Sequence, residues 1–478
     1  MEGMEERVAH VASDIIVKSL QVLLEYPLCD RCLGRMFALL GKGWSNKQRG
    51  EAIKMIIIMV LHRLAREGDE EASKLLERLS ASLYNTAPRL YEELGVERTE
   101  IVCPLCGGVF DKVVNEVVER AARLLREVEA ESFVVGARLA EEVRGVEDSI
   151  VANYGLVHAE SIAAELKREV GKRLRDLGFS VDFSNPDVTL LVEYPSGRIE
   201  ATINPILILG FYKKTARRVS QSSWITSFGV KRYPFSVQDA YTPLLELYKG
   251  SEIVIHAAGR EDVDVRMLGS GRPIVVEVKE PRRRRVKIED AERSVNDEWV
   301  GLFKTVLIER VTRSFMRSVV KGVEGEERHA KIYRALVYVP DGVSHEDIEK
   351  LVEFFKGRLV RQRTPRRVRH RRADIIRERK VYEVSAYKIS DNLFIAFIRA
   401  EGGLYIKELV SGEDTWPGFP DALGKQAHCV ELDVVKVETK LRVKEGLVSG
   451  AARGGVSNGK ATQGLSPSHK EASTQTHP

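Results

Sequence analysis

The side chains best suited to chemistry in this chain are two aspartates, Asp262 and Asp264, which lie between Arg260 and Arg266. A carboxylate beside arginines is biased toward its ionised form, which suits a nucleophile or a base. Short apolar runs on both sides predict two strands with the aspartates on the loop between them. Loops of this kind carry reactive groups, but an ordinary charged hairpin has the same pattern.

Four of the five cysteines form two Cys-x-x-Cys pairs, Cys29/Cys32 and Cys103/Cys106. A two-residue gap lets both thiolates of a pair face one ion, and two pairs complete a tetrahedral zinc site. The alternatives are two redox pairs, or cysteines buried as small apolar side chains. Glycines follow both pairs and supply the turns of zinc knuckles, whereas no thioredoxin-like pattern surrounds them. Cys429 stands alone and is predicted to be a core residue.

Positive charge is concentrated in two arginine-rich segments. Residues 361–380 hold nine arginines and one lysine against two acidic residues, whereas the whole chain carries a net charge of +5. Residues 282–285 are four arginines in a row. A single run of this kind is as often a solvated face, but two runs, one of them close in sequence to the acidic loop, favour a phosphate-binding surface.

Two other kinds of protein share parts of this pattern. Asp264 or Asp262, with Glu277 and Lys279, fits the loose D…ExK motif of metal-dependent nucleases, in which two carboxylates hold magnesium. A non-catalytic RNA-binding protein would need the zinc module and the arginines alone. A methyltransferase would need a glycine-rich strand-turn-helix, and we expect the Gly-Ser-Gly at 269–271 to lie between two strands instead.

The elements that position these residues predict an α+β chain of several domains. Helices are predicted at 8–25, 46–64 with Asn46 as the cap, 159–177 and 345–356, and strands at 181–183, 188–194, 198–203, 253–255, 274–276, 335–339, 382–389, 393–399 and 432–441. The expected parts are a helical zinc-binding region at 1–120, a small α/β region at 121–205, a sheet domain at 206–444 and a disordered tail at 445–478.

Composition places the chain among proteins of the cytoplasm. Charged residues make up 30% of it, and no apolar run approaches the roughly 18 residues that a membrane span needs. The N-terminus is acidic and does not resemble a secretory signal. We therefore expect a cytoplasmic protein with no membrane partner.

Four segments of the chain form one ordered set: Cys-Asp-Arg-Cys-Leu-Gly-Arg at 29–35, Gly-Arg-Glu-Asp at 259–262, Thr-Pro-Arg-Arg-Val-Arg-His-Arg-Arg at 364–372 and Tyr-Ile-Lys-Glu-Leu-Val at 405–410. In this order they resemble segments of the archaeal and eukaryotic tRNA pseudouridine synthases that carry a zinc-binding, THUMP-containing accessory domain. The second is similar to the Gly-Arg-Leu-Asp around the catalytic aspartate of other pseudouridine synthases. Four ordered matches are far more specific than one motif.

The resemblance implies an isomerase that converts uridine 54, uridine 55 or both in the T-loop of tRNA to pseudouridine. Its catalytic carboxylate would be Asp262, which matches the motif where Asp264 does not; whether it acts as a nucleophile or as a base stays open. Tyr333 would stack on the target base, Ile406 and Leu432 would line the uracil pocket, and Lys407 would pair with Asp262. The implied fold is a pseudouridine synthase domain with a mixed, largely antiparallel sheet, plus a helical zinc-binding and THUMP-like accessory domain.

The resemblance and the basic segments also imply an RNA-binding surface. In related enzymes a basic stretch like that at 210–221 forms a loop that grips RNA, although Phe211 stands where the family often has arginine. The residues expected to bind RNA are Lys213, Lys214, Arg217, Arg218, Arg366, Arg367, Arg369, Arg371 and Arg372. We expect tRNA as the partner, a structural zinc, no organic cofactor, and a monomer.

Overall fold

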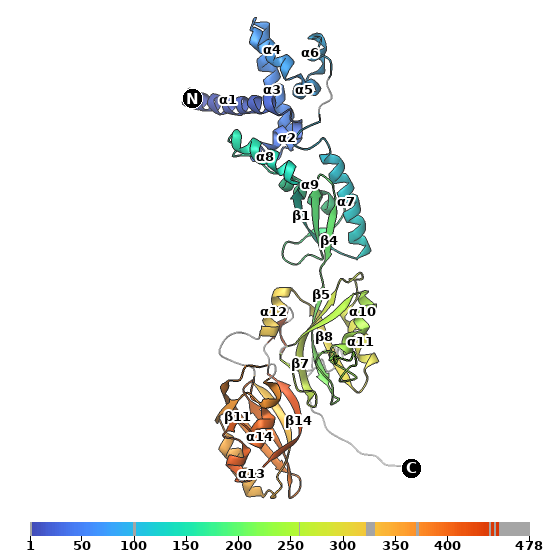
Figure 1. Ribbon diagram of the computed structural model, residues 1–478, viewed down its shortest axis with the longest axis vertical. Helices are drawn as coiled ribbons and strands as arrows, with labels where there is room; N and C mark the ends of the chain where they lie inside the picture. The colour runs from blue at the N-terminus through green and yellow to red at the C-terminus, as the bar shows by residue number, and fades with distance from the viewer. Residues whose placement is uncertain are drawn as a thin grey trace, which may run out of the picture.

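The chain forms two units that lie end to end (Figure 1). The computed structural model describes residues 2–98, 102–257, 259–321, 330–369, 372–438, 441–443 and 446–448. The core of the N-terminal unit runs from Val22 to Tyr194, and that of the C-terminal unit runs from Ile206 to Val437. These two cores share no residue, and the chain passes from one unit to the other at residues 204–205.

The first part of the N-terminal unit is helical. Its elements are α1 (Glu2–Glu25), α2 (Asp30–Arg35), α3 (Asn46–Arg66), α4 (Glu70–Arg78), α5 (Ser80–Leu83), η1 (Tyr84–Thr86), α6 (Pro88–Glu93) and α7 (Phe110–Glu127). The cap of α3 is Ser45 and not Asn46 as predicted, because Ser45 and Gln48 form a reciprocal capping box. Helices α2 and α3 touch at two glycines: a Cβ on Gly34 would lie 1.8 Å from the carbonyl oxygen of Asn46.

The second part is a small α/β layer. Its sheet has the order β2-β1-β3-β4, with β1 (Ser132–Leu139) parallel to β2 (Ser180–Val181) and β3 (Val188–Tyr194), and with β4 (Ile199–Ile203) antiparallel to β3. Helices α8 (Glu141–Asn153) and α9 (Ile162–Asp176) complete it. The predicted helix at 159–177 and strand at 188–194 are confirmed, whereas β1 and α8 were not predicted.

The C-terminal unit is built on a ten-stranded sheet of order β13-β10-β11-β12-β9-β14-β7-β5-β8, with β6 paired to β7. Its strands are β5 (Ile206–Lys214), β6 (Glu252–Ala257), β7 (Arg266–Lys279), β8 (Phe303–Arg310), β9 (Lys331–Tyr338), β10 (Leu359–Arg363), β11 (Ile376–Lys388), β12 (Leu393–Ala400), β13 (Thr415–Trp416) and β14 (His428–Val437). The pair β7 and β14 is parallel and the other pairs of this sheet are antiparallel. The predicted α+β class with a mixed, largely antiparallel sheet is confirmed.

Helices of this unit pack beside the sheet. They are α10 (Pro243–Tyr248), α11 (Ile288–Glu298), α12 (Arg313–Lys321), α13 (His345–Phe355), α14 (Ile406–Ser411) and α15 (Phe419–Leu423), with the short turns η2 (Asp239–Tyr241) and η3 (Arg366–Val368). Figure 1 shows α10 and α11 near β8, and α13 and α14 near β11 and β14.

Strand β7 is longer than predicted. It begins at Arg266, so the Gly-Ser-Gly at 269–271 lies inside a strand and not between two strands. The glycines are needed where β14 and β5 come close: Gly269 has φ +55°, and a Cβ there would lie 1.8 Å from the carbonyl oxygen of Val435. The acidic loop is therefore shorter than expected and joins β6 directly to β7.

The end of the chain is described in part. Strand β15 (Leu441–Val443) pairs antiparallel with β16 (Gly446–Val448), which falls inside the tail expected from residue 445. Residues 449–478 lie outside the described residues, so disorder there stays a prediction. Within the described ranges, no helix combines the length and the apolar character needed to cross a bilayer.

Candidate functional site

A cavity of about 260 Å³ opens in the C-terminal unit where the loop after β6 meets α14 and the strands β9 and β14. Its walls include the expected catalytic residue Asp262 and the four residues expected around the substrate, Tyr333, Ile406, Lys407 and Leu432. They come from four separate segments of the chain, so the fold has gathered them at one place. The cavity is also lined by Arg260, Arg367, Arg372 and Arg377, which makes its rim basic.

Asp262 is held by its neighbours through both its backbone and its side chain. The buried ammonium of Lys214 donates to the Asp262 carbonyl oxygen at 3.0 Å. Arg367, on η3, binds the Asp262 carboxylate through Nη1. The same guanidinium binds the buried carboxylate of Glu408 through Nε at 2.6 Å and Nη2 at 3.1 Å. Arg367 thus ties the acidic loop to α14.

The expected pairing of Lys407 with Asp262 is not what the structure has. Lys407 Nζ lies 2.6 Å from Oδ2 of Asp264, and Arg367 takes the place beside Asp262. Partial burial of Asp264 is the largest single influence and acts to raise its pKa, but the hydrogen bond and charge of Lys407, a backbone hydrogen bond and the charge of Arg367 together lower the pKa of Asp264. The two aspartates therefore have separate cationic partners from two segments of the chain.

Beneath the cavity lies a buried charged cluster around Glu261. The Glu261 side chain is 1% exposed and accepts hydrogen bonds from Arg272 Nε at 2.9 Å and from the Tyr212 hydroxyl at 3.1 and 3.2 Å. Lys214 Nζ lies 3.9 Å from it. Three buried side chains therefore fix the residue that immediately precedes Asp262. These partners were not predicted, because charge in a strand does not show whether the strand is buried.

Tyr333 and Lys331, both on β9, line the same cavity. Burial raises the pKa of Tyr333 to about 12, so its phenol stays protonated near neutral pH. Burial and then the nearby Arg272 lower the pKa of Lys331 to about 7. The Lys331 amine lies close to the acidic loop, since a Cβ added to Gly259 would sit 3.9 Å from it.

The residues expected to bind RNA fall into two groups, exposed side chains and side chains that are bonded inside the fold. Arg218, Arg366 and Arg372 are exposed and Lys213 is half-buried, while Arg371 lies outside the described residues. Lys214 is 1% exposed, so the predicted surface contact is wrong for it. Arg369 is bonded to the Thr364 carbonyl oxygen at 3.0 Å and to Asp414 at 3.0 Å.

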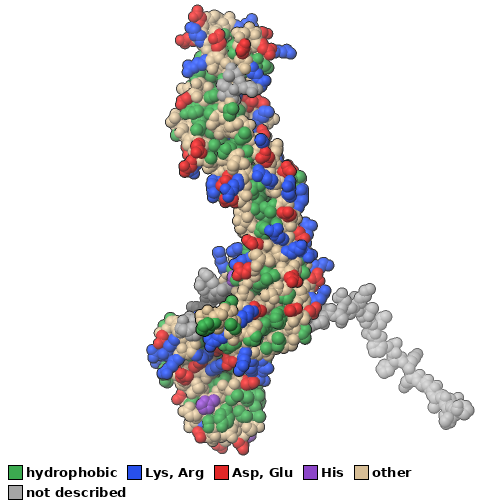
Figure 2. Space-filling view, turned by 45° about the vertical axis from the view of Figure 1, so that its right-hand side comes forward, with side chains coloured by type: hydrophobic (Ala, Val, Ile, Leu, Met, Phe, Trp, Pro, Cys, Tyr) green, Lys and Arg blue, Asp and Glu red, His purple; other side chains and the backbone are tan. Residues whose placement is uncertain are grey.

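Arg217 also has internal partners. It donates to the carbonyl oxygens of Asp264 at 2.7 Å and Leu432 at 2.9 Å and to the fully buried Asp433 at 3.0 Å. Arg266 and Arg334 bind Asp433 as well. The cluster fixes the start of β7 against β14. Figure 2 shows Lys and Arg side chains spread along the visible face of both units.

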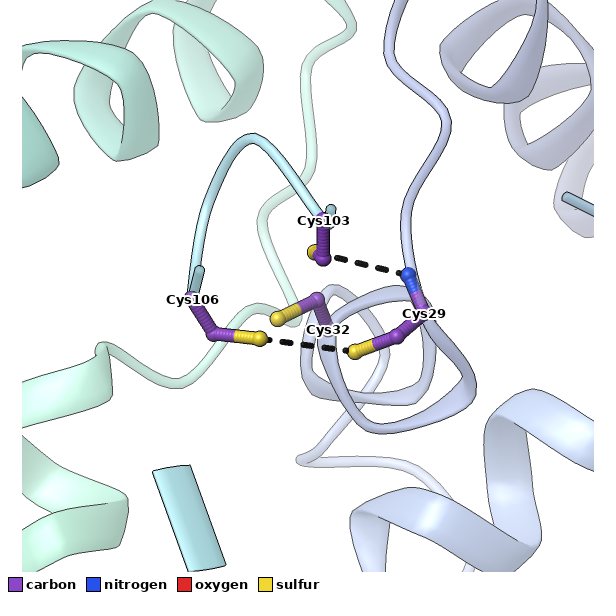
Figure 3. Close-up of side chains that lie close together, drawn as sticks. All are labelled: Cys29, Cys32, Cys103 and Cys106. Atoms are coloured by element: carbon purple, nitrogen blue, oxygen red, sulfur yellow. Dashed lines mark hydrogen bonds between the residues drawn. The ribbon is translucent and has the colours of Figure 1, made fainter. Parts of the chain in front are cut away.

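The four paired cysteines meet in the N-terminal unit (Figure 3). Cys29 and Cys32 belong to the start of α2, and Cys103 and Cys106 to the turn before α7; their sulfur atoms all lie within 4.8 Å of one another. The backbone N–H of Cys29 also donates to Cys103 Sγ at 3.4 Å. Four thiols at this spacing form a donor set compatible with one zinc ion. Cys429 is half-buried in the other unit and makes no part of this set.

A buried arginine supports a charged cysteine cluster. Arg35 is 0% exposed and donates from Nε to Glu165 at 2.7 Å, yet both its terminal nitrogens lack a hydrogen-bond partner. The nearby Cys32 is one of the groups that raise the pKa of Arg35. Thiolates bound to a divalent metal carry net negative charge, which a buried guanidinium beside them would offset. The residues present therefore fit the metal.

The nuclease motif is not assembled. Glu277 lies eleven residues after Arg266 in β7, a separation of roughly 35 Å at the rise of an extended strand. Its carboxylate is bonded to His256 at 2.7 Å, and Lys279 is bonded to Glu252 at 2.7 Å. Asp264 is at the other end of the strand, so the three residues cannot share one magnesium ion.

Comparison with known proteins gives matches over most of the chain. A family model described as "Pus10, C-terminal" matches residues 207–438, and one described as "Pus10 THUMP domain, archaeal" matches residues 117–193. A curated tRNA pseudouridine synthase Pus10 from Aeropyrum pernix is 46% identical over 432 residues, which cover 89% of this chain and 98% of that protein. Proteins of the same name from Ignisphaera aggregans and Pyrococcus furiosus are 40% and 35% identical, and the matches cover 87% and 88% of this chain and 97% and 98% of those proteins.

Proposed function

This chain belongs to the Pus10 family of tRNA pseudouridine synthases, and we propose that it isomerises uridine 54, uridine 55 or both in the T-loop of tRNA, with Asp262 as the catalytic carboxylate. The observation that carries the proposal is the cavity in which Asp262 meets Tyr333, Ile406 and Leu432. A partly exposed carboxylate, an aromatic ring and apolar walls suit a base that must be bound, turned and rejoined to its ribose.

The reaction breaks the bond from C1′ of the ribose to N1 of uracil and forms one from C1′ to C5. The base therefore loses a proton at C5 and gains one at N1, with no net redox change and no organic cofactor. Asp262 must be ionised whether it attacks the ribose or removes a sugar proton. Arg367 places its positive charge directly beside this carboxylate.

The remaining residues have distinct roles in the proposal. Tyr333, which is 8% exposed, offers its ring as a stacking face and its protonated hydroxyl as a hydrogen-bond donor. Ile406 and Leu432 form apolar walls that exclude water. Because Asp262 lines a cavity and its side chain is only 25% exposed, the target uridine must leave its stack in the RNA before the carboxylate can reach it.

The N-terminal unit would contribute to tRNA binding, and zinc would stabilise it. Exposed lysines and arginines of α9, Lys167, Lys172 and Arg175, suit phosphate contacts. Cys29, Cys32, Cys103 and Cys106 would hold the zinc, which when bound joins α2 to the turn before α7. The oligomeric state we expect is a monomer.

Base-resolution mapping of pseudouridine in an unmodified tRNA transcript tests the proposal. The wild-type protein should form pseudouridine at position 54 or 55, and Asp262→Asn should form none while tRNA affinity stays within a few-fold. Asp391→Asn is the matched control, because the Asp391 side chain is 93% exposed. Full activity of the Asp262 variant would remove the assignment.

Chelation separates the synthase from the nuclease. Brief EDTA treatment that leaves the structural zinc in place should not reduce pseudouridine formation in a tRNA folded by monovalent salt, because Asp262 needs no exchangeable metal. Glu277→Gln should leave the RNA and the activity unchanged. Magnesium-dependent strand scission that is lost in Glu277→Gln would establish the nuclease instead.

A further inference from the structure

A buried arginine of the C-terminal unit contacts the N-terminal unit of the chain. Arg284, in the run of four arginines between β7 and α11, is 5% exposed. Its Nη2 atom lies 2.8 Å from Oδ1 of Asp187, and its Nη1 atom donates to the carbonyl oxygen of Asn204 at 2.9 Å. Both partners belong to the N-terminal side of the joint. This arginine is therefore used inside the fold, although the run as a whole suggested a phosphate-binding surface.

A second contact lies beside the first. Glu129, two residues after α7, accepts hydrogen bonds from the backbone N–H groups of Arg284 at 2.8 Å and Arg285 at 2.9 Å. These backbone bonds lower the pKa of Glu129, the bond from Arg285 being the larger cause. The N-terminal unit thus contacts the arginine segment at the Arg284 side chain and at the backbone N–H groups of Arg284 and Arg285.

Each side of the joint is anchored in its own unit. Asp187 uses its second oxygen to accept from the N–H groups of Glu131 at 2.9 Å and Ser132 at 3.1 Å, which fixes it at the start of β1. On the other side, the N–H groups of Arg282 and Arg283 donate to the carbonyl oxygen of Tyr248 at 3.1 and 2.9 Å, at the end of α10. The segment around Arg284 is thereby bonded to ordered elements of both units.

The joint matters because the two cores are separate. The covalent crossing at residues 204–205 alone would leave a hinge, and units that share no apolar core are expected to move relative to one another. The contacts of Arg284 and Glu129 restrain this hinge. Figure 1 shows the result, an extended molecule in which the N-terminal unit is held away from the strands that carry the cavity.

We propose that Arg284 is a positioning residue that sets the distance and angle between the N-terminal unit and the cavity, so that the enzyme prefers a complete folded tRNA to an isolated T-arm. The proposal rests on the proposed function. A fixed spacing raises the effective concentration of the T-loop at the cavity once the N-terminal unit has bound another part of the same tRNA. A T-arm stem-loop touches one unit only, so the joint gives it no advantage.

The steady-state test compares two substrates. Arg284→Ala should raise KM for a full-length tRNA transcript about tenfold, an estimate for a lost fixed linkage, with kcat unchanged. Both constants for a T-arm stem-loop should stay as they are. Arg283→Ala is the matched control: it removes an exposed arginine from the same run and should leave the ratio of the two KM values unchanged.

A second variant guards against local misfolding. Glu129→Ala removes the carboxylate that accepts from the backbone N–H groups of Arg284 and Arg285 and leaves the Arg284 side chain unchanged. It should shift KM for full-length tRNA in the same direction by a smaller factor. Arg284→Lys keeps the charge but lacks the two separate nitrogen atoms with which Arg284 reaches Asp187 and Asn204, so it should resemble Arg284→Ala and not the wild type.

Small-angle X-ray scattering of the free protein tests the joint without RNA. Arg284→Ala should broaden the distribution of interatomic distances relative to the wild type and to Arg283→Ala. Unchanged scattering would overturn the proposal, and so would equal losses on tRNA and stem-loop. A wild-type protein that forms no pseudouridine at position 54 or 55 would overturn the proposed function while the scattering result stood on its own.

Discussion

Lys407 Nζ lies 2.6 Å from the carboxylate of Asp264, two residues beyond the carboxylate that Arg367 binds. The sequence predicted one ion pair, between Lys407 and Asp262, whereas the structure has two, one at each aspartate. Arg367 contacts the aspartate that faces the cavity. Lys407 holds the end of the loop in place through Asp264, whose side chain is more than half exposed.

This separation predicts different effects for the two aspartates. Asp264→Asn should lower kcat less than tenfold, because the asparagine keeps the shape of the side chain and loses part of one exposed ion pair. Asp262→Asn should lower kcat by more than a thousandfold, since under the proposed function it removes the reacting carboxylate. Single-turnover formation of pseudouridine measures both, and equal losses would contradict the division of roles.

Arg367 should not tolerate lysine. Arg367 uses three separate nitrogens of its planar guanidinium for Asp262 and the two oxygens of Glu408, and an ammonium lacks this geometry, so Arg367→Lys should lower kcat at least tenfold and leave tRNA affinity within a few-fold. The neighbouring Arg366 is exposed, and Arg366→Lys is the control that should keep the wild-type kcat. A fall in affinity with kcat unchanged would place Arg367 on the RNA-binding surface instead.

The salt dependence of tRNA binding should separate surface arginines from internal ones. Arg366→Ala and Arg372→Ala should each reduce the slope of log K against log salt by about one unit, because each removes a phosphate contact. Arg369→Ala should leave the slope unchanged and lower the melting temperature, since its partners are Thr364 and Asp414. Filter binding between 50 and 200 mM salt, an interval where such slopes are large, gives the comparison.

Metal analysis tests the cysteine cluster. We expect one zinc per chain, and Cys103→Ser should lower the melting temperature of the N-terminal unit more than that of the C-terminal unit, because a structural metal contributes folding free energy directly. Cys429→Ser is the control and should keep the zinc content of the wild type. Wild-type protein without zinc, and with the same melting as Cys103→Ser, would refute the site.

Lys331 should lower the free energy of unfolding at neutral pH. Its pKa is lowered to about 7 in the folded chain, so between pH 7 and about 10.4 the unfolded chain binds the extra proton and the free energy of unfolding rises with pH. Lys331→Met should therefore be more stable than the wild type at pH 7, by a margin that shrinks toward pH 10. Urea denaturation at pH 7 and pH 9.5 measures it, with the exposed Lys356→Met as a control that shows no such trend.

Sequence patterns predicted much of the fold, with identifiable gaps. Strand β3 was found because its buried and half-buried positions alternate, as a one-sided strand requires. Strand β1 was missed because six of its eight positions are half-buried without alternation, and its place depends on pairing with β2 and β3. Asn46 was taken as a cap one residue too late, an error typical of helix ends.

The sequence predicted which residues line the cavity but not which of them contact one another. Resemblance identified Asp262, Tyr333 and Lys407, and all three line one space. It could not show that Lys407 reaches Asp264, because that depends on where α14 lies relative to the loop. Lys214 was misplaced for a related reason: β5 is covered on both faces, so a lysine in a basic stretch became a buried donor to the Asp262 backbone.

The cysteine cluster closes a long loop in the N-terminal unit. Helices α3 to α6 leave the cluster after Cys32 and the chain returns to it at Cys103, with α3 held to α2 by the close contact at Gly34. Figure 1 shows α4, α5 and α6 at the far end of the molecule. Once its ends are fixed, doubling the length of a loop costs only about 0.6 kcal/mol. Helices can therefore be exchanged or added at the tip of this loop without altering the cavity in the C-terminal unit.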